Sequence, residues 1–283
     1  MAMPEPPTQG NRFTSIEPDQ FNTLLNDYNH AVAQKLVELD EERYTTIPKR
    51  LQEQPTGSAT LSKEEVATLV DWKLAHGKFR PTLRSLVQQN DENTIAEVTR
   101  DAFASYDKSA KDARAAKSAL AALTKLRGIG PATASLLLSV FDTGNAPFFS
   151  DELFRWCMYE DSKGQGWDRD IKYNVKEYLE LYDKVHAFKE RFRKAFDREL
   201  SVVDIEQVAY TLVKGSVDSQ TGGEKADGPS KKRKVDSKND DDEIEEKKKA
   251  NSKVAKSAPK ATASIETTAT ASESLRRSAR RQK

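Results

Sequence analysis

Residues 123–138 decide how this chain folds, and they read LTKLRGIGPATASLLL. The run contains a tight turn between two apolar segments. Gly128 and Gly130 permit positive φ angles, and without a Cβ atom they let a ligand approach the main chain. Pro131 suits the first position of a helix, whose free N–H groups and dipole would face the turn. The stretch therefore predicts two helices joined by a short turn over residues 115–141.

The turn also predicts an anion site, and a nucleic-acid phosphate is the anion that we expect there. Two or three main-chain amides would converge on the phosphate, while basic side chains beside the turn would add positive charge. The predicted phosphate site comprises Lys125, Arg127, Gly128, Ile129, Gly130, Ala132 and Thr133. A plain connection between packed helices is the alternative, because glycine-containing turns are common.

The rest of the folded region has helical spacing of its apolar residues and no strand pattern. A helix of about twenty residues is predicted from Pro18, and Ser62 with Glu65 forms a capping box that opens a second helix. Further helices are predicted over 81–90, 92–106 and 111–126, from Ser150, and between Ile171 and Lys214. The predicted fold class is therefore all-α, a multi-helix domain over residues 15–215 that contains the hairpin.

Both ends of the chain differ in composition from this domain. Residues 1–14 are rich in Pro and poor in large apolar residues and predict a disordered arm, and after Gly215 the hydrophobic residues almost vanish. Residues 216–283 therefore predict a disordered tail. The net charge is −4 through Gly215 and +5 beyond it, so any phosphate contact made by the acidic domain must be local.

Several classes of protein are excluded by composition. Cys157 is the single cysteine, which rules out an internal disulfide and a cysteine-ligated zinc or iron–sulfur site. We predict no metal and no cofactor. No apolar run approaches the roughly 18 residues of a membrane span, and the first residues lack the features of a signal peptide, so no membrane association is expected.

A compact basic cluster in the predicted tail indicates the nucleus. It comprises Lys231, Lys232, Arg233 and Lys234, and it resembles a monopartite nuclear localisation signal. A nuclear import receptor is therefore one expected partner. A chance basic run in a lysine-rich tail is the alternative.

Residues 115–156 together resemble the helix-hairpin-helix DNA glycosylase superfamily of base-excision repair. The hairpin carries the motif Leu-x-Gly-Ile-Gly-x-x-Thr-Ala, and Asp151 follows it at the start of a run that reads Asp-Glu-Leu-Phe-Arg. The resemblance implies that Asp151 activates water or stabilises the sugar cation as an N-glycosidic bond breaks. The alternative is that Ser150, Asp151 and Glu152 only cap a helix.

Two departures from the superfamily limit what the resemblance implies. Bifunctional members carry a lysine two residues after the second glycine, where this chain has Ala132, so the resemblance implies a monofunctional enzyme if there is chemistry. The cysteine set of the iron–sulfur members is missing. Over residues 65–160 the chain more closely resembles a group of uncharacterised eukaryotic proteins that share a Trp-Lys-x-x-x-Gly-Lys-Phe-Arg-Pro string, here Trp72 to Pro81.

Other side chains are candidates for contacts with DNA. Lys78 and Arg80, together with Lys73 and His76, would touch a phosphate, although a solvated surface is the alternative. The aromatic candidates for stacking on an extruded base are Trp72, Phe148, Phe149 and Trp156, and the alternative for these is a place in the core.

Two functions remain open at this point. The first is a nuclear protein that binds double-stranded DNA and acts as a monofunctional DNA glycosylase. The second keeps the fold without the chemistry, as a noncatalytic scaffold that binds DNA weakly or contacts a protein partner. Catalysis requires Asp151 to line a cavity beside the hairpin, whereas the scaffold expects side chains to fill that space.

Overall fold

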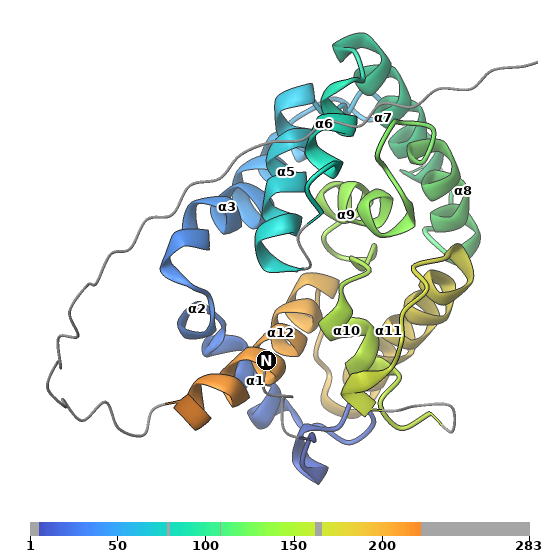
Figure 1. Cartoon of the computed structure of the whole chain (residues 1–283). Helices are drawn as coiled ribbons and strands as arrows, with labels where there is room; N and C mark the ends of the chain where they lie inside the picture. Colours follow the sequence, from blue (N-terminus) through green and yellow to red (C-terminus); the bar gives the residue numbers. More distant parts are fainter. Residues whose placement is uncertain (1–5, 78–79, 108, 162–165, 222–283) are drawn as a thin grey trace, which may run out of the picture. The chain divides into compact units, whose positions relative to one another are not determined.

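The structure is a computed structural model that describes residues 6–77, 80–107, 109–161 and 166–221. These residues form an all-α fold without strands (Figure 1). The α-helices are α1 (Pro18–Asn26), α2 (Tyr28–Ala31), α3 (Val37–Glu41), α4 (Ile47–Gln52), α5 (Lys63–His76), α6 (Leu83–Gln88), α7 (Glu92–Asp107), α8 (Ala113–Leu123), α9 (Pro131–Phe141), α10 (Asp151–Cys157), α11 (Val175–Phe196) and α12 (Val202–Thr221). Short 3₁₀ turns are η1 (Gln9–Asn11), η2 (Gln34–Leu36) and η4 (Gly166–Asp168), and η3 (Glu42–Thr46) is a π-helical turn.

Polar side chains begin several of these helices. The capping box predicted at Ser62 and Glu65 is present, with each side chain accepting a hydrogen bond from the other residue's main-chain N–H. Asp112 caps α8, Ser150 caps α10 and Asn174 caps α11, and each side chain accepts a hydrogen bond from the main-chain N–H three residues later. Each cap satisfies an N–H group that the first turn of a helix leaves without a partner.

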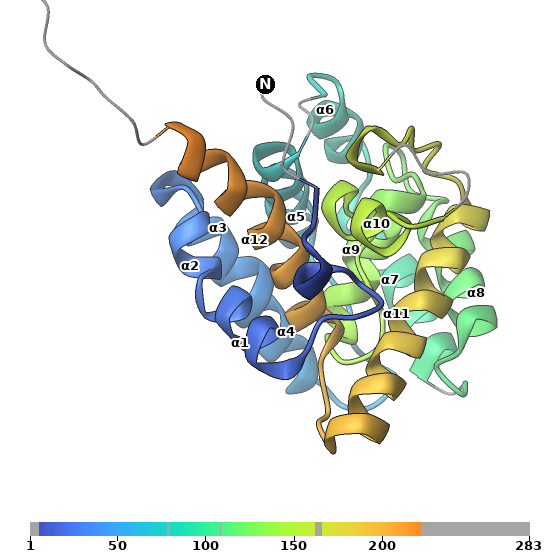
Figure 2. The same ribbon diagram turned by 90° about the horizontal axis from the view of Figure 1, so that it is seen from below.

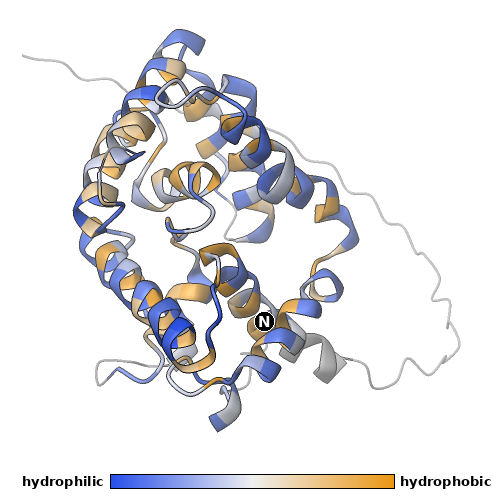
Figure 3. Ribbon diagram, turned by 180° about the vertical axis from the view of Figure 1, so that it is seen from behind, coloured by the Kyte–Doolittle hydropathy of each residue, from blue (hydrophilic) through white to orange (hydrophobic). Residues whose placement is uncertain are grey.

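Helix α9 is the central helix of the fold. Every residue from Ala132 to Val140 is buried, which is typical of a helix that is apolar on all sides. It contacts α4, α5, α8 and α11 and lies inside the ring of helices in Figure 1. Figure 3 shows the hydrophobic colour concentrated on inward-facing ribbon, with hydrophilic residues on the outer helices. The second half of the hairpin is therefore also the core of the domain.

Helix α12 joins the beginning of the chain to its later helices. It packs against α1, α2 and α10, and Figure 2 shows it beside α1 and α2. Residues 6–14 of the predicted arm also pack on the domain. Phe13 is buried between Trp156 and Phe188, and the Trp156 indole donates a hydrogen bond to the Asn11 carbonyl (2.9 Å). One apolar side chain thus holds an otherwise polar segment.

The single helix of about twenty residues predicted from Pro18 is wrong. The chain instead forms α1, α2, η2 and α3, with extended residues at Val32 and Ala33 that bury Val32 and Leu36 in a small separate cluster. A π-helical turn then precedes Pro48, which cannot donate a hydrogen bond to the carbonyl four residues earlier. Helical spacing does not show where tertiary packing breaks a helix.

The boundary predicted at Gly215, between the helical domain and the tail, lies inside a helix of the structure. Helix α12 continues past Gly215 to Thr221. The remainder of the predicted tail, including the basic cluster Lys231–Lys234, lies outside the described residues. No helix within the described ranges is both long enough and apolar enough to cross a membrane.

Candidate functional site

The hairpin predicted over residues 115–141 is present as α8, a turn at residues 124–130, and α9. Gly130 is the N-cap of α9, and its carbonyl accepts hydrogen bonds from the Thr133 and Ala134 N–H groups. Among the described residues, the N–H groups of Gly130 and Ala132 have no acceptor. These two donors at the exposed start of a helix are the arrangement that binds anions.

The two glycines of the turn differ in conformation, and only Gly128 adopts the positive φ that both permit. Gly128 has φ +79°, and an added Cβ atom would lie 3.0 Å from the Leu86 Cβ and 3.2 Å from the Val87 nitrogen. Gly130 has φ −90° and ψ 177°, the extended conformation of an N-cap, with no atom within 4 Å of an added Cβ. Gly128 is therefore packed against α6, and Gly130 is open to a ligand.

Asn90 holds the turn in place. Its side chain accepts a hydrogen bond from the Arg127 N–H (2.8 Å) and donates hydrogen bonds to the Arg127 and Val87 carbonyls (3.0 and 2.8 Å). Asn90 is buried, so these contacts are shielded from water. The turn is therefore fixed by a residue that lies well outside the recognisable motif.

Ser135 connects the hairpin to the segment that carries Asp151. Its hydroxyl accepts a hydrogen bond from the Phe149 N–H and donates one to the Ala132 carbonyl, each at 2.9 Å. Ser135 is fully buried in α9. Because Phe149 precedes α10 by two residues, this contact sets the position of Asp151 relative to the hairpin.

The Asp151 carboxylate does not cap α10, because the N-cap is Ser150, whose hydroxyl accepts a hydrogen bond from the Leu153 N–H. Instead, the Tyr173 hydroxyl donates a hydrogen bond to Asp151 Oδ1 (2.7 Å), and Arg155 lies 3.7 Å from Oδ2. Asp151 remains 35% exposed. Tyr173 has a left-handed φ of 52°, a costly conformation for a residue other than glycine.

One cavity of about 1010 Å³ brings the hairpin and Asp151 together. The hairpin contributes Gly128, Gly130, Pro131, Ala132 and Thr133, which we call the hairpin wall. Asp151, Glu152 and Arg155 of α10 also line the cavity. Asp151 therefore lines a cavity beside the hairpin, which a catalytic role would require.

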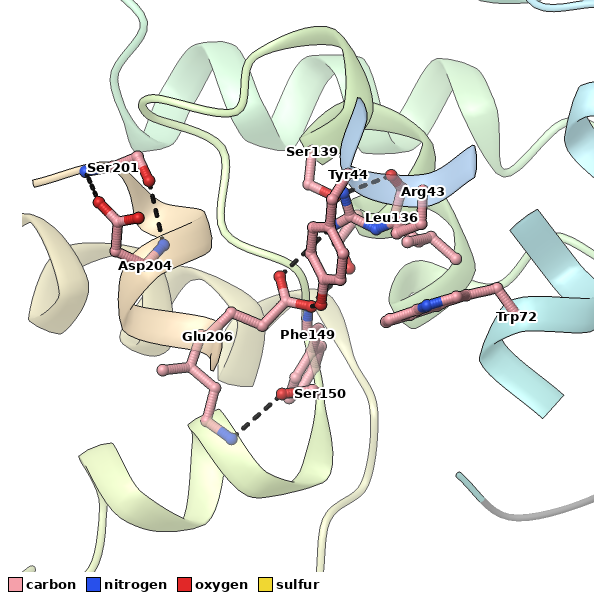
Figure 4. Close-up of polar contacts among 12 residues, drawn as sticks. Arg43, Tyr44, Trp72, Leu136, Ser139, Phe149, Ser150, Ser201, Asp204 and Glu206 are labelled. Carbon is pink, nitrogen blue, oxygen red and sulfur yellow. Dashed lines mark hydrogen bonds and ion pairs between the residues drawn. The ribbon is translucent and has the colours of Figure 1, made fainter. Parts of the chain in front are cut away.

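The same cavity has a second boundary, which we call the side-chain wall. It comprises Tyr44, Trp72, Lys73, His76, Glu206 and Tyr210. Figure 4 shows Glu206 of α12 directed toward Tyr44 and Arg43. The Tyr44 hydroxyl donates to Glu206 Oε1 (2.9 Å), and Arg43, which is fully buried, lies 3.3 Å from Oε2 and donates to the Ser139 hydroxyl (2.8 Å).

Burial shifts the pKa of several groups in the cavity. It raises the pKa of Glu206, although Arg43 and the Tyr44 hydrogen bond act in the other direction. Burial likewise raises the pKa of the Glu152 carboxyl. The pKa of the Lys73 ammonium is lowered by burial; the Asp151 charge opposes this shift and the Arg80 charge adds to it.

The predicted DNA contacts fall into three groups. Arg80 lines the cavity and lies 5.7 Å from the Tyr173 ring. Trp72, Phe148 and Phe149 also belong to the lining, but they are buried in the core. Trp156 is fully buried against Phe13 and does not line the cavity, so it is a core residue. Lys78 lies outside the described residues.

The two basic residues of the turn are exposed and lie outside the cavity lining. Arg127 donates a hydrogen bond to Gln89 (3.1 Å), and Lys125 is free to extend into solvent. Ile129, which was predicted to belong to the phosphate site, is buried in the core, and its N–H donates to the Leu126 carbonyl (3.2 Å), so this residue anchors the turn instead. Any charge contribution from Arg127 and Lys125 would therefore act from outside the cavity.

The sequence interpretation did not assign Tyr173, Glu206 or Lys73 to a site around Asp151. Two of these carry a signal in retrospect. Lys73 continues the buried face of Val66, Leu69 and Val70 at helical spacing, and Glu206 lies between the buried Ile205 and Val208. A charged residue within an apolar stripe indicates a buried site. Tyr173 has no comparable signal.

The comparisons with known proteins give no relative on which to base an assignment. No family model matches the chain, and neither the curated proteins nor the solved structures contain a match. Within the part of the chain that the structure describes, no group of three or more His, Cys, Asp or Glu residues could hold a metal ion.

Proposed function

We propose that this chain is a nuclear DNA-binding protein whose helical domain removes a base from double-stranded DNA by breaking the N-glycosidic bond. The hairpin wall would hold a phosphate, and Asp151 would act on the sugar of an extruded nucleotide. The observation that carries the proposal is the shared cavity, because the hairpin residues and Asp151 line the same space.

The size of the cavity supports extrusion of a nucleotide. At about 1010 Å³ it is at the upper end of the roughly 300–1,000 Å³ that ligand sites occupy. An enzyme that acts on a paired base must take that base out of the stack, and aromatic side chains of the cavity lining can then contact its faces. The scaffold alternative expects this space to be filled.

Local charge also supports contact with DNA, even though the domain is acidic. The cationic residues that line the cavity outnumber the anionic ones; they are Lys73, Arg80, Arg155, Lys172 and Lys214, against Asp151, Glu152 and Glu206. Basic side chains near a cavity mouth attract phosphate. The cavity therefore has the local positive charge that the domain as a whole lacks.

Asp151 would act electrostatically in the reaction. An ionised carboxylate stabilises the positive charge that develops on the sugar as the bond to the base breaks, and it can orient the water that follows. The Tyr173 hydrogen bond fixes one oxygen, and the second remains within reach of Arg155 only through a long contact of 3.7 Å. Asp151 keeps the partial exposure that contact with a substrate requires.

Gly130→Asp tests the phosphate site. Aspartate is a favoured N-cap at these backbone angles, so the fold should be kept or stabilised, while its charge repels a phosphate. We expect the Kd for a DNA duplex at fixed salt to rise at least about tenfold, the equivalent of 1.4 kcal/mol. Gly130→Asn, the neutral control, should have the smaller effect. Unchanged affinity in Gly130→Asp would rule out the hairpin as the phosphate site.

Base release tests the chemistry. The protein would be incubated with duplexes that carry uracil, alkylated bases or oxidised bases, and abasic product would be measured. We expect release from at least one duplex and a loss of about 100-fold or more in Asp151→Asn, with DNA affinity nearly unchanged. Absence of release from every duplex, or equal release by the variant, would leave the noncatalytic scaffold.

The nuclear part of the proposal rests on the basic cluster Lys231, Lys232, Arg233 and Lys234, which a nuclear import receptor would bind. Replacing these four residues with alanine in a fluorescent fusion should remove nuclear accumulation. Accumulation that persists would assign import to another segment.

A further inference from the structure

Three cationic side chains from separate segments lie around Asp151, and we call Lys73, Arg80 and Arg155 the cation cluster. All three line the cavity. Arg155 lies 3.7 Å from Asp151 Oδ2, and Arg80 lies 5.7 Å from the ring of Tyr173, whose hydroxyl donates to Asp151 Oδ1 (2.7 Å). The charges of Asp151 and Arg80 both act on the pKa of Lys73, so these groups lie within electrostatic range of one another. The fold thus gathers three positive charges around one carboxylate.

The Lys73 amine has no hydrogen-bond or ion-pair partner among the residues that the structure describes, and its Nζ atom lies 5.6 Å from the centre of the buried Phe148 ring. Lys184, another partly buried lysine, instead lies 2.8 Å from Asp161. A charged amine that is removed from water without a partner costs free energy. A ligand that supplies an acceptor and negative charge would recover this cost.

The two arginines of the cation cluster are also incompletely paired. Within the described ranges Arg80 has no ion-pair partner, and its guanidinium lies over the Tyr173 ring. Arg155 donates from Nε to the Arg169 carbonyl (3.2 Å), while its contact with Asp151 is long. Asp151 also accepts the Tyr173 hydrogen bond, so a single carboxylate serves three cations. The cation cluster therefore has two positive charges in excess when each of its side chains is protonated.

The other carboxylates of the cavity do not balance this excess. Glu206 forms its ion pair with Arg43, which is not part of the cavity lining. Burial raises the pKa of Glu152 and so disfavours its charged form. Burial also lowers the pKa of the Lys73 ammonium, and a bound anion would oppose that effect. The charge balance of the cavity thus points to a negatively charged ligand.

We propose that the cation cluster is a second anion subsite, which binds the phosphate monoester at the end of a DNA strand. A monoester carries a charge of about −1.5 to −2 near pH 7 and has three acceptor oxygens, which match the excess charge and the cationic donors of the cluster. A phosphodiester within a strand carries one negative charge, and the neutral N–H groups of the hairpin wall suit it. The inference rests on the DNA-binding part of the proposed function and is independent of base release. It adds recognition of a strand break.

Nicked duplexes test the proposal. A DNA dumbbell has no ends, and a single nick in it can carry a 5′-phosphate, a 3′-phosphate or hydroxyl groups only. The Kd of the full chain for each nick would be measured by fluorescence anisotropy at fixed salt. We expect at least about tenfold tighter binding to one phosphorylated nick than to the hydroxyl nick, and the tighter one identifies the strand end that the subsite takes. Equal Kd values for all three nicks would overturn the proposal.

Variants connect the phosphate preference to the cation cluster. Lys73→Met removes one charge but keeps a long side chain, and Arg80→Gln removes another; each should reduce the preference to about threefold or less. Lys73→Arg keeps a cation and should keep most of the preference. Lys125→Met is the matched control, because Lys125 is exposed and outside the cavity lining, and it should affect all three nicks equally. Thermal melting would confirm that all variants are folded.

Inorganic phosphate separates recognition of a phosphate group from a general effect of salt. At constant ionic strength, with chloride as the balancing anion, phosphate should displace the phosphorylated nick more effectively from the wild-type protein than from Lys73→Met. Equal competition in the two proteins would contradict the assignment to the cation cluster.

The outcomes distinguish this inference from the proposed function. If the wild-type protein binds all three nicks equally while Gly130→Asp weakens that binding, the hairpin site stands and the second subsite is wrong. A phosphate preference that survives in both Lys73→Met and Arg80→Gln likewise contradicts the inference. If the wild-type protein binds no dumbbell, the DNA-binding proposal fails and the inference fails with it.

Discussion

The hairpin wall of the cavity comes from residues that are neighbours in the sequence, whereas the side-chain wall brings together residues from η3, α5 and α12. The hairpin wall offers N–H groups at the start of α9, which can hold any phosphate. The side-chain wall offers a carboxylate, an amine and aromatic rings, which depend on the packing of the whole domain. The proposed binding of a phosphate thus depends on residues that are close in the sequence. Any selectivity or chemistry depends on residues that only tertiary packing brings together.

Among substitutions that compare the two walls, the largest loss of stability is expected on the side-chain wall. Glu206→Ala leaves the Arg43 guanidinium buried without its carboxylate partner, and breaking such a pair costs about 3–5 kcal/mol. Urea unfolding should show this loss in the free energy of unfolding. Asp204→Ala, a control on the same helix, removes only a contact with Ser201 and should cost about 1 kcal/mol. Equal losses would mean that the Arg43–Glu206 pair does not hold this wall.

A smaller effect is expected within the hairpin wall, where substitution of the two glycines should change the free energy of unfolding by different amounts. Gly128→Ala adds a Cβ atom at positive φ, 3.0 Å from Leu86, and should lower the free energy of unfolding by about 1–3 kcal/mol. Gly130→Ala has open space around it and should cost about 0.5 kcal/mol or less. Thermal or urea unfolding checks the difference. If both variants unfold alike, α6 does not restrain the turn as described.

The next prediction concerns the contact that orients Asp151. Tyr173→Phe removes the hydroxyl that donates to Asp151 Oδ1 while keeping the ring under Arg80. A hydrogen bond to a charged group contributes about 1.5–3 kcal/mol, and water can replace part of it at this exposure, so base release should fall roughly three- to tenfold. Tyr159→Phe, away from the cavity lining, is the control. An unchanged rate of release would show that Tyr173 does not position the carboxylate.

Individual residues show how far sequence reasoning reaches in this protein. The capping box at Ser62, the α8–α9 hairpin and the burial of Ile129 follow from local spacing and are present. The break of the first helix at Val32 does not follow, because Val32 and Leu36 leave the helical path to form a separate cluster with Tyr28. Local pattern cannot anticipate a contact between distant segments.

The candidate site divides in the same way. Asp151 and the hairpin glycines stand out because a short motif contains them, whereas Trp156, chosen for its type, is a core residue. Asn90 and Tyr173 hold the turn and the carboxylate through single contacts across 37 and 22 residues of chain. No pattern within a short window marks such residues.

The sequence alone determined that the chain is helical, that a glycine turn opens α9, and where the acidic and basic charge lies, because backbone conformation and helix periodicity depend on neighbouring residues. Only the tertiary structure decided that Gly130 faces open space while Gly128 packs on α6, and that Lys73, Glu206 and Asp151 line one cavity. The physical reason is that burial and proximity arise when distant segments pack, and both change the charge state and reactivity of a side chain.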